Sequence, residues 1–551
     1  MPNDTRELPA ANDDLYRFLG GSPLTVAFRL ILLSILVGVV LAAVGFDPWN
    51  IVNSIRLLFQ RIWELGFDAI NGLWRYFLLG AVIVIPIWLL SRMFSVPRGR
   101  LLARRPDSLN SVSKVTTAQV FAIAGPAMVA NLTTPLIGIV STIAIGRLGD
   151  ATLLGGVAMA SVIFDCLFWL FGFLRMSTLA FTAQSLGAGE TEELRPILMR
   201  GLIVAALIGA GLIILQIPLA AILFRVMGGS EGVTRAAKIY FTIRIWAAPL
   251  ALANYVVLGW LIGQARARLA LGVQIAINVI NMAATALLVL VLEAGIAGAA
   301  IAAVTAEAAG LVLGVLIAGH LSRGQPAVPR TALLDRPKLI RMLAVNRDIM
   351  IRTASLIAVF LFFTSQGARS GDLTLAANAV LNNFLLMSSF FLDGLANAAE
   401  QLCGRAYGAR AKNQFSDAVR LVVLWGFGFA LAVTAAFALF GPSLIDIMTA
   451  SEDVRRSARD YLWFVVLSPM LAVFAFAFDG VYIGATWARD MRNLMVLSLL
   501  MFLGAWLALR SFGNTGLWGA LLVHYAARGG LQALRYPALV RASFPQKPLS
   551  G

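Results

Sequence analysis

Five carboxylates lie inside stretches that are otherwise long and apolar, and they are the residues of this sequence best suited to chemistry. They are Asp165, Glu307, Asp393, Glu400 and Asp479. An ionisable side chain at the bilayer centre costs at least about 2.5–3.5 kcal/mol on insertion scales, so such residues face a protein interior or a watery cavity. Burial and neighbouring charges change how readily a carboxylate binds a proton or a cation. We therefore expect these residues to couple transport to H⁺ or Na⁺.

The stretch from Thr374 to Arg410 carries two of these acids on one helix face. At about 100° per residue, its polar stripe includes Asn382, Asp393, Asn397 and Glu400, and the opposite faces hold Leu, Phe, Met and Ala. The pattern predicts a helix that lines a transport pathway. Asp393 is the stronger candidate because it lies deeper in the span, whereas the alternative for Glu400 is a plain salt bridge with the nearby Arg405.

Asp165 shares a predicted helix face with an aromatic ring and a thioether. Trp169 offers a cation–π surface and Met176 a soft, adaptable one, so this face suits an aromatic cation. The competing interpretation is a carboxylate that bonds to neighbouring helices or pairs with Arg175.

The other acids and several amides have structural alternatives. Glu307 is surrounded by Ala and Gly, and small residues let helices approach closely, so a hydrogen bond between helices competes with a coupling role. Four further residues are predicted to line a cavity, although polar groups in membrane helices are more often simple links between helices. They are Asn131, Gln184, Asn254 and Tyr255.

The composition places the chain in a membrane. Of its 551 residues 59% are hydrophobic and 13% charged, and the mean hydropathy is +0.83. The net charge of +16 comes from Lys and Arg scattered through short loops, a topogenic pattern rather than a nucleic-acid surface. The bias predicts both termini in the cytoplasm. Two Cys and two His exclude a disulfide framework and disfavour a histidine metal site, so we expect no cofactor. The sequence contains no GKS or GKT element, which argues against an ATPase, and no Ser–His–Asp set that would indicate an enzyme.

The chain from residue 118 onward contains twelve apolar stretches, each about long enough to cross a bilayer of about 30 Å. These fall into two repeats at one constant offset, which carries Met227 onto Met448 and Tyr240 onto Tyr461. Each repeat holds an even number of spans, so both enter the membrane in the same orientation. The sequence therefore predicts an all-α integral membrane protein with a core of two six-helix bundles. Asp479 departs from the repeat, because its counterpart is Leu258, and this favours a specific role.

The residues before this core form a separate part. Two apolar stretches, 24–44 and 73–90, are predicted as extra membrane helices, with an interfacial amphipathic segment at 47–67 between them. The first is expected to be a retained helix rather than a signal peptide. We divide the chain into a two-helix extension of unknown role (1–105), an N-terminal lobe (106–335) and a C-terminal lobe (336–551).

Several strings in the core resemble the multidrug and toxic compound extrusion (MATE) family, in particular its DinF-like branch. They include FLRMSTLAFTAQSLGAGE (Phe173 to Glu190), LDGLANAAEQLCGRAYGAR (Leu392 to Arg410) and DGVYIGATWARDMRN (Asp479 to Asn493). The resemblance covers about 115–540. It implies a secondary antiporter that exports organic cations or other amphipathic compounds in exchange for H⁺ or Na⁺.

The chain departs from that family in its first core helix. Members commonly carry an aspartate in a string resembling V-D-T, and here it reads Val140-Ser141-Thr142. We hypothesise that Asp165 in the next helix replaces it. Pro126 and Pro135 each remove a backbone donor and favour a kink, and the resemblance implies that this helix bends during gating.

Other functions stay open at this point. A flippase for a lipid-linked precursor is expected to have a strongly cationic cavity, whereas the intramembrane residues considered above are acidic. A membrane-embedded lipid enzyme lacks an assembled nucleophile or metal site, and a non-transporting sensor or scaffold is a further alternative. The leading interpretation is a bacterial inner-membrane antiporter that acts as a monomer on small molecules, not on nucleic acid.

Overall fold

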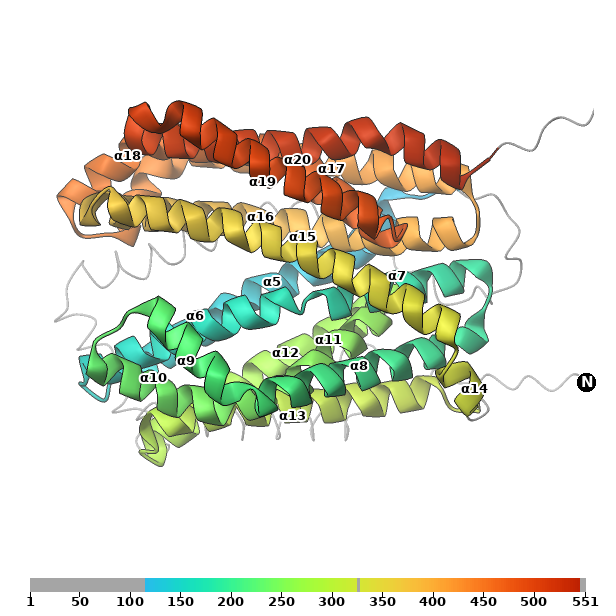
Figure 1. Ribbon diagram of the computed structural model, residues 1–551, viewed down its shortest axis with the longest axis horizontal. Helices are drawn as coiled ribbons and strands as arrows, with labels where there is room; N and C mark the ends of the chain where they lie inside the picture. Colours follow the sequence, from blue (N-terminus) through green and yellow to red (C-terminus); the bar gives the residue numbers. More distant parts are fainter. Residues whose placement is uncertain (1–113, 325–327, 546–551) are drawn as a thin grey trace, which may run out of the picture.

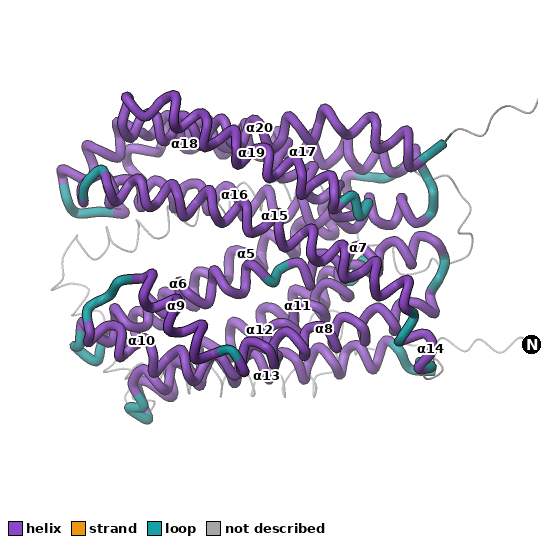
Figure 2. Tube along the Cα trace, in the orientation of Figure 1, coloured by secondary structure: helices purple, strands orange, loops and turns teal. Residues whose placement is uncertain are grey.

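The computed structural model describes residues 114–324 and 328–545, and this part of the chain is helical, with no strand (Figures 1 and 2). The all-α prediction is confirmed for these residues. The extra N-terminal helices at 24–44 and 73–90, and the segment at 47–67, lie outside the described residues.

The first bundle runs from α5 to α13. Its helices are α5 (Thr117–Gly146), α6 (Ala151–Leu170), α7 (Phe173–Ala188), α8 (Leu194–Ile214), α9 (Gln216–Met227), α10 (Glu231–Arg244), α11 (Ala248–Gly263), α12 (Ala267–Thr285) and α13 (Gly295–Leu321). Short turns join them: η2 (Thr191–Glu193), η3 (Ile245–Ala247) and the π-helical η4 (Ala286–Val291). Since α6 and α7 lie within one candidate span, and α10 and α11 within another, the bundle contains six segments long and apolar enough to cross a membrane.

The second bundle follows a short linker helix, α14 (Arg330–Leu333). It consists of α15 (Arg336–Arg369), α16 (Asp372–Gly408), α17 (Lys412–Met448), α18 (Glu452–Gly484), α19 (Ala488–Leu509) and α20 (Gly513–Ser543), with the turn η5 (Arg510–Phe512) before α20. The described residues hold 11 candidate spans, and the last of them, Ala488–Ser543, contains both α19 and α20. The chain therefore makes twelve predicted crossings, six in each bundle.

Apolar side chains cover the outside of both bundles. Ile214, Leu439 and Leu534 are 78%, 73% and 81% exposed, which is costly in water and favourable against lipid tails. In Figure 1 the two bundles lie one above the other, and α15 crosses from α14 beside the first bundle to the second.

Glycine contacts recur in the two bundles at the offset predicted from the sequence. A Cβ on Gly259 would overlap the carbonyl oxygen of Arg175, and one on Gly480, its counterpart in the second repeat, would overlap that of Ala396. In the same way Gly263 packs on Leu179, and Gly484 packs on Glu400. Only glycine permits backbones to approach so closely. Matched contacts of this kind confirm that the core is a pair of parallel repeats.

The bundles differ where the first acid-bearing helix meets its neighbour. In the first bundle the helix is interrupted at Phe171 and Gly172 between α6 and α7, whereas α16 runs unbroken.

The start of α6 is capped by Asp150, whose carboxylate accepts a hydrogen bond from the Thr152 amide at 2.8 Å. Hydrogen bonds from the side chain and backbone of Thr152 lower the pKa of Asp150.

Candidate functional site

The five intramembrane carboxylates divide between the two bundles. Asp165 on α6 and Glu307 on α13 belong to the first bundle, while Asp393, Glu400 and Asp479 belong to α16 and α18 of the second. Each group is accompanied by arginines, but the balance of charge differs between the two groups.

The first-bundle cluster contains two carboxylates and one guanidinium. Arg244, at the end of α10, interacts electrostatically with both Asp165 and Glu307. Glu307 is held in place by Asn254, whose amide donates to its carboxylate at 2.7 Å and to its carbonyl at 2.9 Å. Asp165 is exposed at the protein surface. Counted as formal charges, the cluster therefore holds two carboxylates and one guanidinium.

Aromatic rings surround this cluster. Arg244 lies over the Phe164 ring at 4.9 Å and donates to the Tyr240 hydroxyl at 2.8 Å. Trp169, one helical turn after Asp165, is 41% exposed, and its ring lies 6.3 Å from that of Phe360 on α15 of the other bundle. A surface with an exposed acid and an exposed indole suits an organic cation.

The second-bundle cluster is built on Asp479. Its carboxylate forms ion pairs with Arg352 on α15 and Arg528 on α20, and it accepts a hydrogen bond from Gln532 at 2.8 Å. All three charged residues are at most 4% exposed. Arg528 also lies over the Phe476 ring at 5.3 Å. This acid is fully engaged by groups of its own bundle.

The guanidinium of Arg175 connects the two bundles. Arg175 on α7 donates to the Asn397 side chain on α16, and its Nη1 lies 4.0 Å from the Glu400 carboxylate. Glu400 is 2% exposed. Asp393, which is half-buried, lies in the field of Arg175, Arg528 and Arg352. The two alternatives drawn from the sequence were therefore wrong about partners: Glu400 meets Arg175 rather than Arg405, and Arg175 turns to the other bundle rather than to Asp165.

The residues predicted to line a cavity mostly connect helices. Asn131 donates to the Phe390 carbonyl at 3.3 Å, and Gln184 donates to the Gly484 carbonyl at 2.7 Å, both across the junction between the bundles. Asn254 and Asn397 make the contacts given above. Met176, Tyr255 and Asn382 are partly buried. Tyr255 interacts electrostatically with Glu307 and more weakly with Asp165, so it belongs with the first-bundle cluster.

The predicted gating prolines lie within a single helix. Pro126 and Pro135 are both inside α5, which is helical from Thr117 to Gly146. Met128, one turn before Asn131, packs against Gly394 of α16. The helix with the two prolines therefore lies directly at the junction of the bundles.

Comparison with known proteins identifies the family. The sequence pattern of MatE matches residues 126–287 and 349–507. The chain is 38% identical over 410 residues to DNA damage-inducible protein F of Escherichia coli (strain K12), covering 74% of this chain and 89% of that protein. The chain belongs to the MatE family. The identity to DNA damage-inducible protein F also confirms the resemblance to the DinF-like branch.

Two further likenesses agree. This MatE protein is 26% identical over 444 residues to a protein of Rhizobium meliloti (strain 1021) named probable multidrug resistance protein NorM, covering 76% and 92% of the two chains. Its fold matches a solved MATE family transporter described as outward-facing, with a TM-score of 0.70, 19% identity, and coverage of 78% and 96%. Residues 62–97 match a domain of unknown function, DUF6460.

The arginines of this MatE protein are the members of the candidate site that the sequence reasoning missed. Arg352 was counted among the loop residues that set topology, yet it is 4% exposed and paired with Asp479. Arg528 is the one Lys or Arg between residues 511 and 534. A lone charge in an apolar span is itself a signal of function. Arg528 could therefore have been predicted as a candidate site residue from the sequence. Arg352 could not, because a charge at the start of a span is also typical of a loop.

The bundles of this MatE protein are joined on the face where α14 lies, which we call the linker face. There a Cβ on Gly187 would overlap the Arg405 carbonyl, and one on Gly408 would overlap that of Gln184. Arg341 of α15 donates to the Gln184 side chain at 3.1 Å. These contacts hold the ends of α7 and α16 together.

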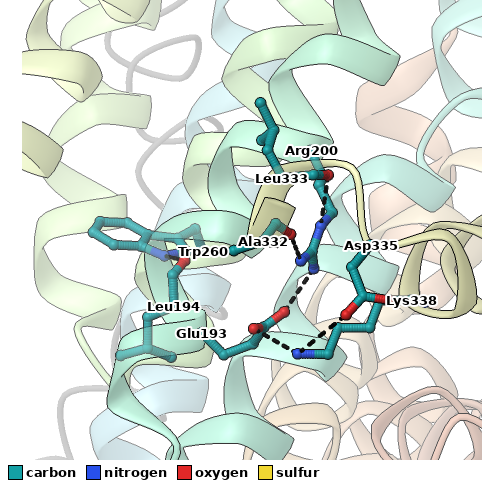
Figure 3. A network of polar contacts seen from close by, with 8 residues as sticks. All are labelled: Glu193, Leu194, Arg200, Trp260, Ala332, Leu333, Asp335 and Lys338. Carbon is teal, nitrogen blue, oxygen red and sulfur yellow. Dashed lines mark hydrogen bonds and ion pairs between the residues drawn. The ribbon is translucent and has the colours of Figure 1, made fainter. Parts of the chain in front are cut away.

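The linker itself docks on the first bundle through a buried arginine (Figure 3). Arg200 on α8 is 3% exposed and donates to the carbonyls of Ala332 and Leu333. The Nη1 group of Arg200 donates to the Glu193 carboxylate at 2.6 Å. The same carboxylate accepts a hydrogen bond from Lys338 at 2.8 Å. Arg200, counted from the sequence as a topogenic loop residue, thus fixes the start of α15 to the first bundle.

Proposed function

We propose that the protein is a secondary antiporter of the bacterial inner membrane. It exports organic cations or other amphipathic compounds in exchange for H⁺ or Na⁺. The names of the two relatives from Escherichia coli and Rhizobium meliloti, one a DNA damage-inducible protein and one a probable multidrug resistance protein, support this class of function over an enzyme. The excess of Lys and Arg on the linker face supports a cytoplasmic location for that face and for both termini.

The observation that carries the proposal is the unbalanced charge of the first-bundle cluster. Asp165 and Glu307 share one guanidinium, Arg244, so the cluster attracts one further positive charge. Either a substrate cation beside Trp169 or a coupling ion supplies it, and the two compete for the same acids. Competition for one site is the simplest physical basis of exchange, because binding of one ion releases the other.

Alternation follows from the way the bundles meet. The linker-face contacts of Gly187, Gly408 and Arg341 close one side of the junction. Transport requires these contacts to open while the opposite ends of the bundles approach, with α5 and its two prolines bending between them. With the linker face on the cytoplasmic side, these contacts belong to a state that is closed towards the cytoplasm.

The test is Asp165→Asn in inverted membrane vesicles that take up a fluorescent organic cation. Removing the charge of Asp165 leaves the cluster neutral, so we expect gradient-driven uptake to fall at least about tenfold, as for a lost interaction of about 1.4 kcal/mol or more. Glu231→Gln, at the exposed start of α10, is the control and should leave uptake unchanged. Intact uptake with Asp165→Asn would refute the role of Asp165.

One observation favours a second function, the flipping of an anionic lipid-linked precursor. Arg175, Arg352 and Arg528 bring three guanidiniums to the second-bundle cluster and its junction. They face three carboxylates, so the cluster as a whole has no excess positive charge, and we place this function second.

A further inference from the structure

We propose that Arg175 is the residue that couples the occupancy of the Glu400 carboxylate to opening of the linker face. This inference rests on the proposed antiport function and adds a positioning residue to it. The sequence suggested Arg175 as a possible partner of Asp165, and it did not suggest a charged link between the two bundles.

Glu400 depends on a cation from the other bundle. It is 2% exposed, and its Oε2 atom has no hydrogen-bond partner among the described residues. The cation within 4.0 Å of it is Arg175 of α7. A buried charge without a partner is strongly unfavourable. Arg352 of the same bundle also interacts electrostatically with Glu400, but the contribution of Arg175 is lost when α7 and α16 separate.

Asp479 and Glu307 find their ion-pair or hydrogen-bond partners within their own bundles. Asp479 pairs with Arg352 and Arg528 of the second bundle, and Glu307 is bound by Asn254 of the first. Movement of the bundles as rigid bodies leaves these contacts intact. Among the contacts of Glu400, Asp479 and Glu307 described above, the Arg175–Glu400 pair spans the two bundles, so such a movement changes its geometry.

The pair also stands at the part of the junction that must open. Arg175 and Glu400 lie on α7 and α16, the helices whose ends meet on the linker face at Gly187 and Gly408. When those ends separate, Arg175 leaves Asn397 and Glu400. The carboxylate must then bind a proton or another cation, so opening and ion binding become linked.

The repeat shows that packing does not require these two side chains. At the offset that carries Gly259 onto Gly480, Arg175 corresponds to Ala396 and Glu400 to Leu179. The glycine contacts on their backbones are the same in both bundles, with Gly259 on Arg175 and Gly480 on Ala396. The backbone arrangement thus tolerates alanine and leucine, and the charged pair is an addition on one side of a symmetric scaffold.

The experiment measures the linker-face distance directly. Spin labels are placed on Glu192→Cys and Arg489→Cys, exposed positions from each bundle on this face, in a background with Cys166→Ala and Cys403→Ala. Pulsed electron resonance in lipid nanodiscs reports the ratio of open to closed molecules. We expect Arg175→Ala to raise this ratio about tenfold, equivalent to about 1.4 kcal/mol, and Glu400→Gln to raise it as well.

The decisive comparison is the double variant. If the pair carries the coupling, Arg175→Ala changes the ratio by less than about twofold once Glu400 is Gln, because the interaction is already lost. Arg341→Ala is the matched control: it also removes a linker-face contact, but its effect should be the same with and without Glu400→Gln. An unchanged ratio in Arg175→Ala, or equal effects in both backgrounds, would overturn the proposal.

A second pair of variants separates charge from shape. Arg175→Gln keeps a donor for Asn397 without the positive charge and should open the face like Arg175→Ala, whereas Arg175→Lys should restore part of the closed population. If Gln closes the face as well as Arg does, the charge is irrelevant and the proposal fails. The distance is measured without any ion gradient, so this result is distinguishable from failure of antiport.

Discussion

At the scale of single residues, some buried or membrane-embedded acids are paired with arginines, and others lack an arginine of their own. Asp479 is matched twice, by Arg352 and Arg528, inside one bundle. Asp165 is exposed and shares Arg244 with Glu307. From this difference we propose that Asp479 holds the second bundle together and that Asp165 takes part in exchange.

Replacing Asp479 with Ala should therefore reduce stability rather than merely alter transport. The change leaves two buried guanidiniums without a counter-ion, and breaking a buried pair in this way costs about 3–5 kcal/mol. Thermal unfolding in detergent, followed by tryptophan fluorescence, measures the loss. Asp446→Ala is the control, since Asp446 is 39% exposed beside Arg459 and a surface pair contributes at most about 1 kcal/mol. Equal melting temperatures for the two variants would contradict the assignment.

At this scale the sequence indicated which acids matter but not their partners. The break in the repeat at Leu258 and Asp479 drew attention to a residue that pairs with two arginines, and its specific role stays a prediction. Its two arginines come from α15 and α20, the first and the last helix of the second bundle. Residues so distant in sequence are brought together by packing alone, and no local pattern predicts that.

Among the helices, glycines of α11 and α18 lie in close contact with the backbones of neighbouring helices. A Cβ on Gly480 would overlap the backbone of Ala396, and a backbone atom has no rotamer by which to move aside. We predict that Gly480→Ala and Gly259→Ala each destabilise the protein by about 1–3 kcal/mol through overpacking. Urea or thermal unfolding of the purified variants measures the change.

The control for these glycine variants lies in α20. Gly530 has no atom within 4 Å of the added Cβ, so Gly530→Ala should be neutral or stabilise the helix by up to about 1 kcal/mol. Equal losses at Gly480 and Gly259 are expected because the two positions are related by the repeat. A loss in one bundle only would show that the contacts are not equivalent.

The helices themselves were well predicted because their signal is local. Runs of apolar residues of bilayer length indicate a span whatever the rest of the chain does. The interruptions were not predicted: the break at Phe171 and Gly172 and the π-helical turn Ala286–Val291 have no distinct sequence signal. Both depend on how neighbouring helices pack.

For the molecule as a whole, the two bundles contain the candidate membrane spans found among the described residues. Every crossing of the core lies between Thr117 and Ser543. We therefore expect deletion of residues 1–105 to leave efflux per molecule unchanged, with protein amount checked by immunoblotting. A loss of efflux with normal expression would show that the extension takes part in transport.

The paired-bundle architecture followed from the internal repeat, whereas the junction between the bundles did not. Contacts such as Arg175 with Asn397 and Gln184 with Gly484 join residues that the repeat does not relate to each other. A repeat predicts how each bundle is built but contains no information on how far apart the two bundles stand. The state of the junction is a property of the whole molecule.

The most direct test of antiport uses the unaltered protein in inverted vesicles supplied with a fluorescent organic cation. A pH gradient and a Na⁺ gradient are imposed separately, with ionophore-treated vesicles as the reference. We predict that at least one gradient drives accumulation of the cation and that collapsing this gradient releases it. Equal accumulation with and without either gradient would contradict antiport.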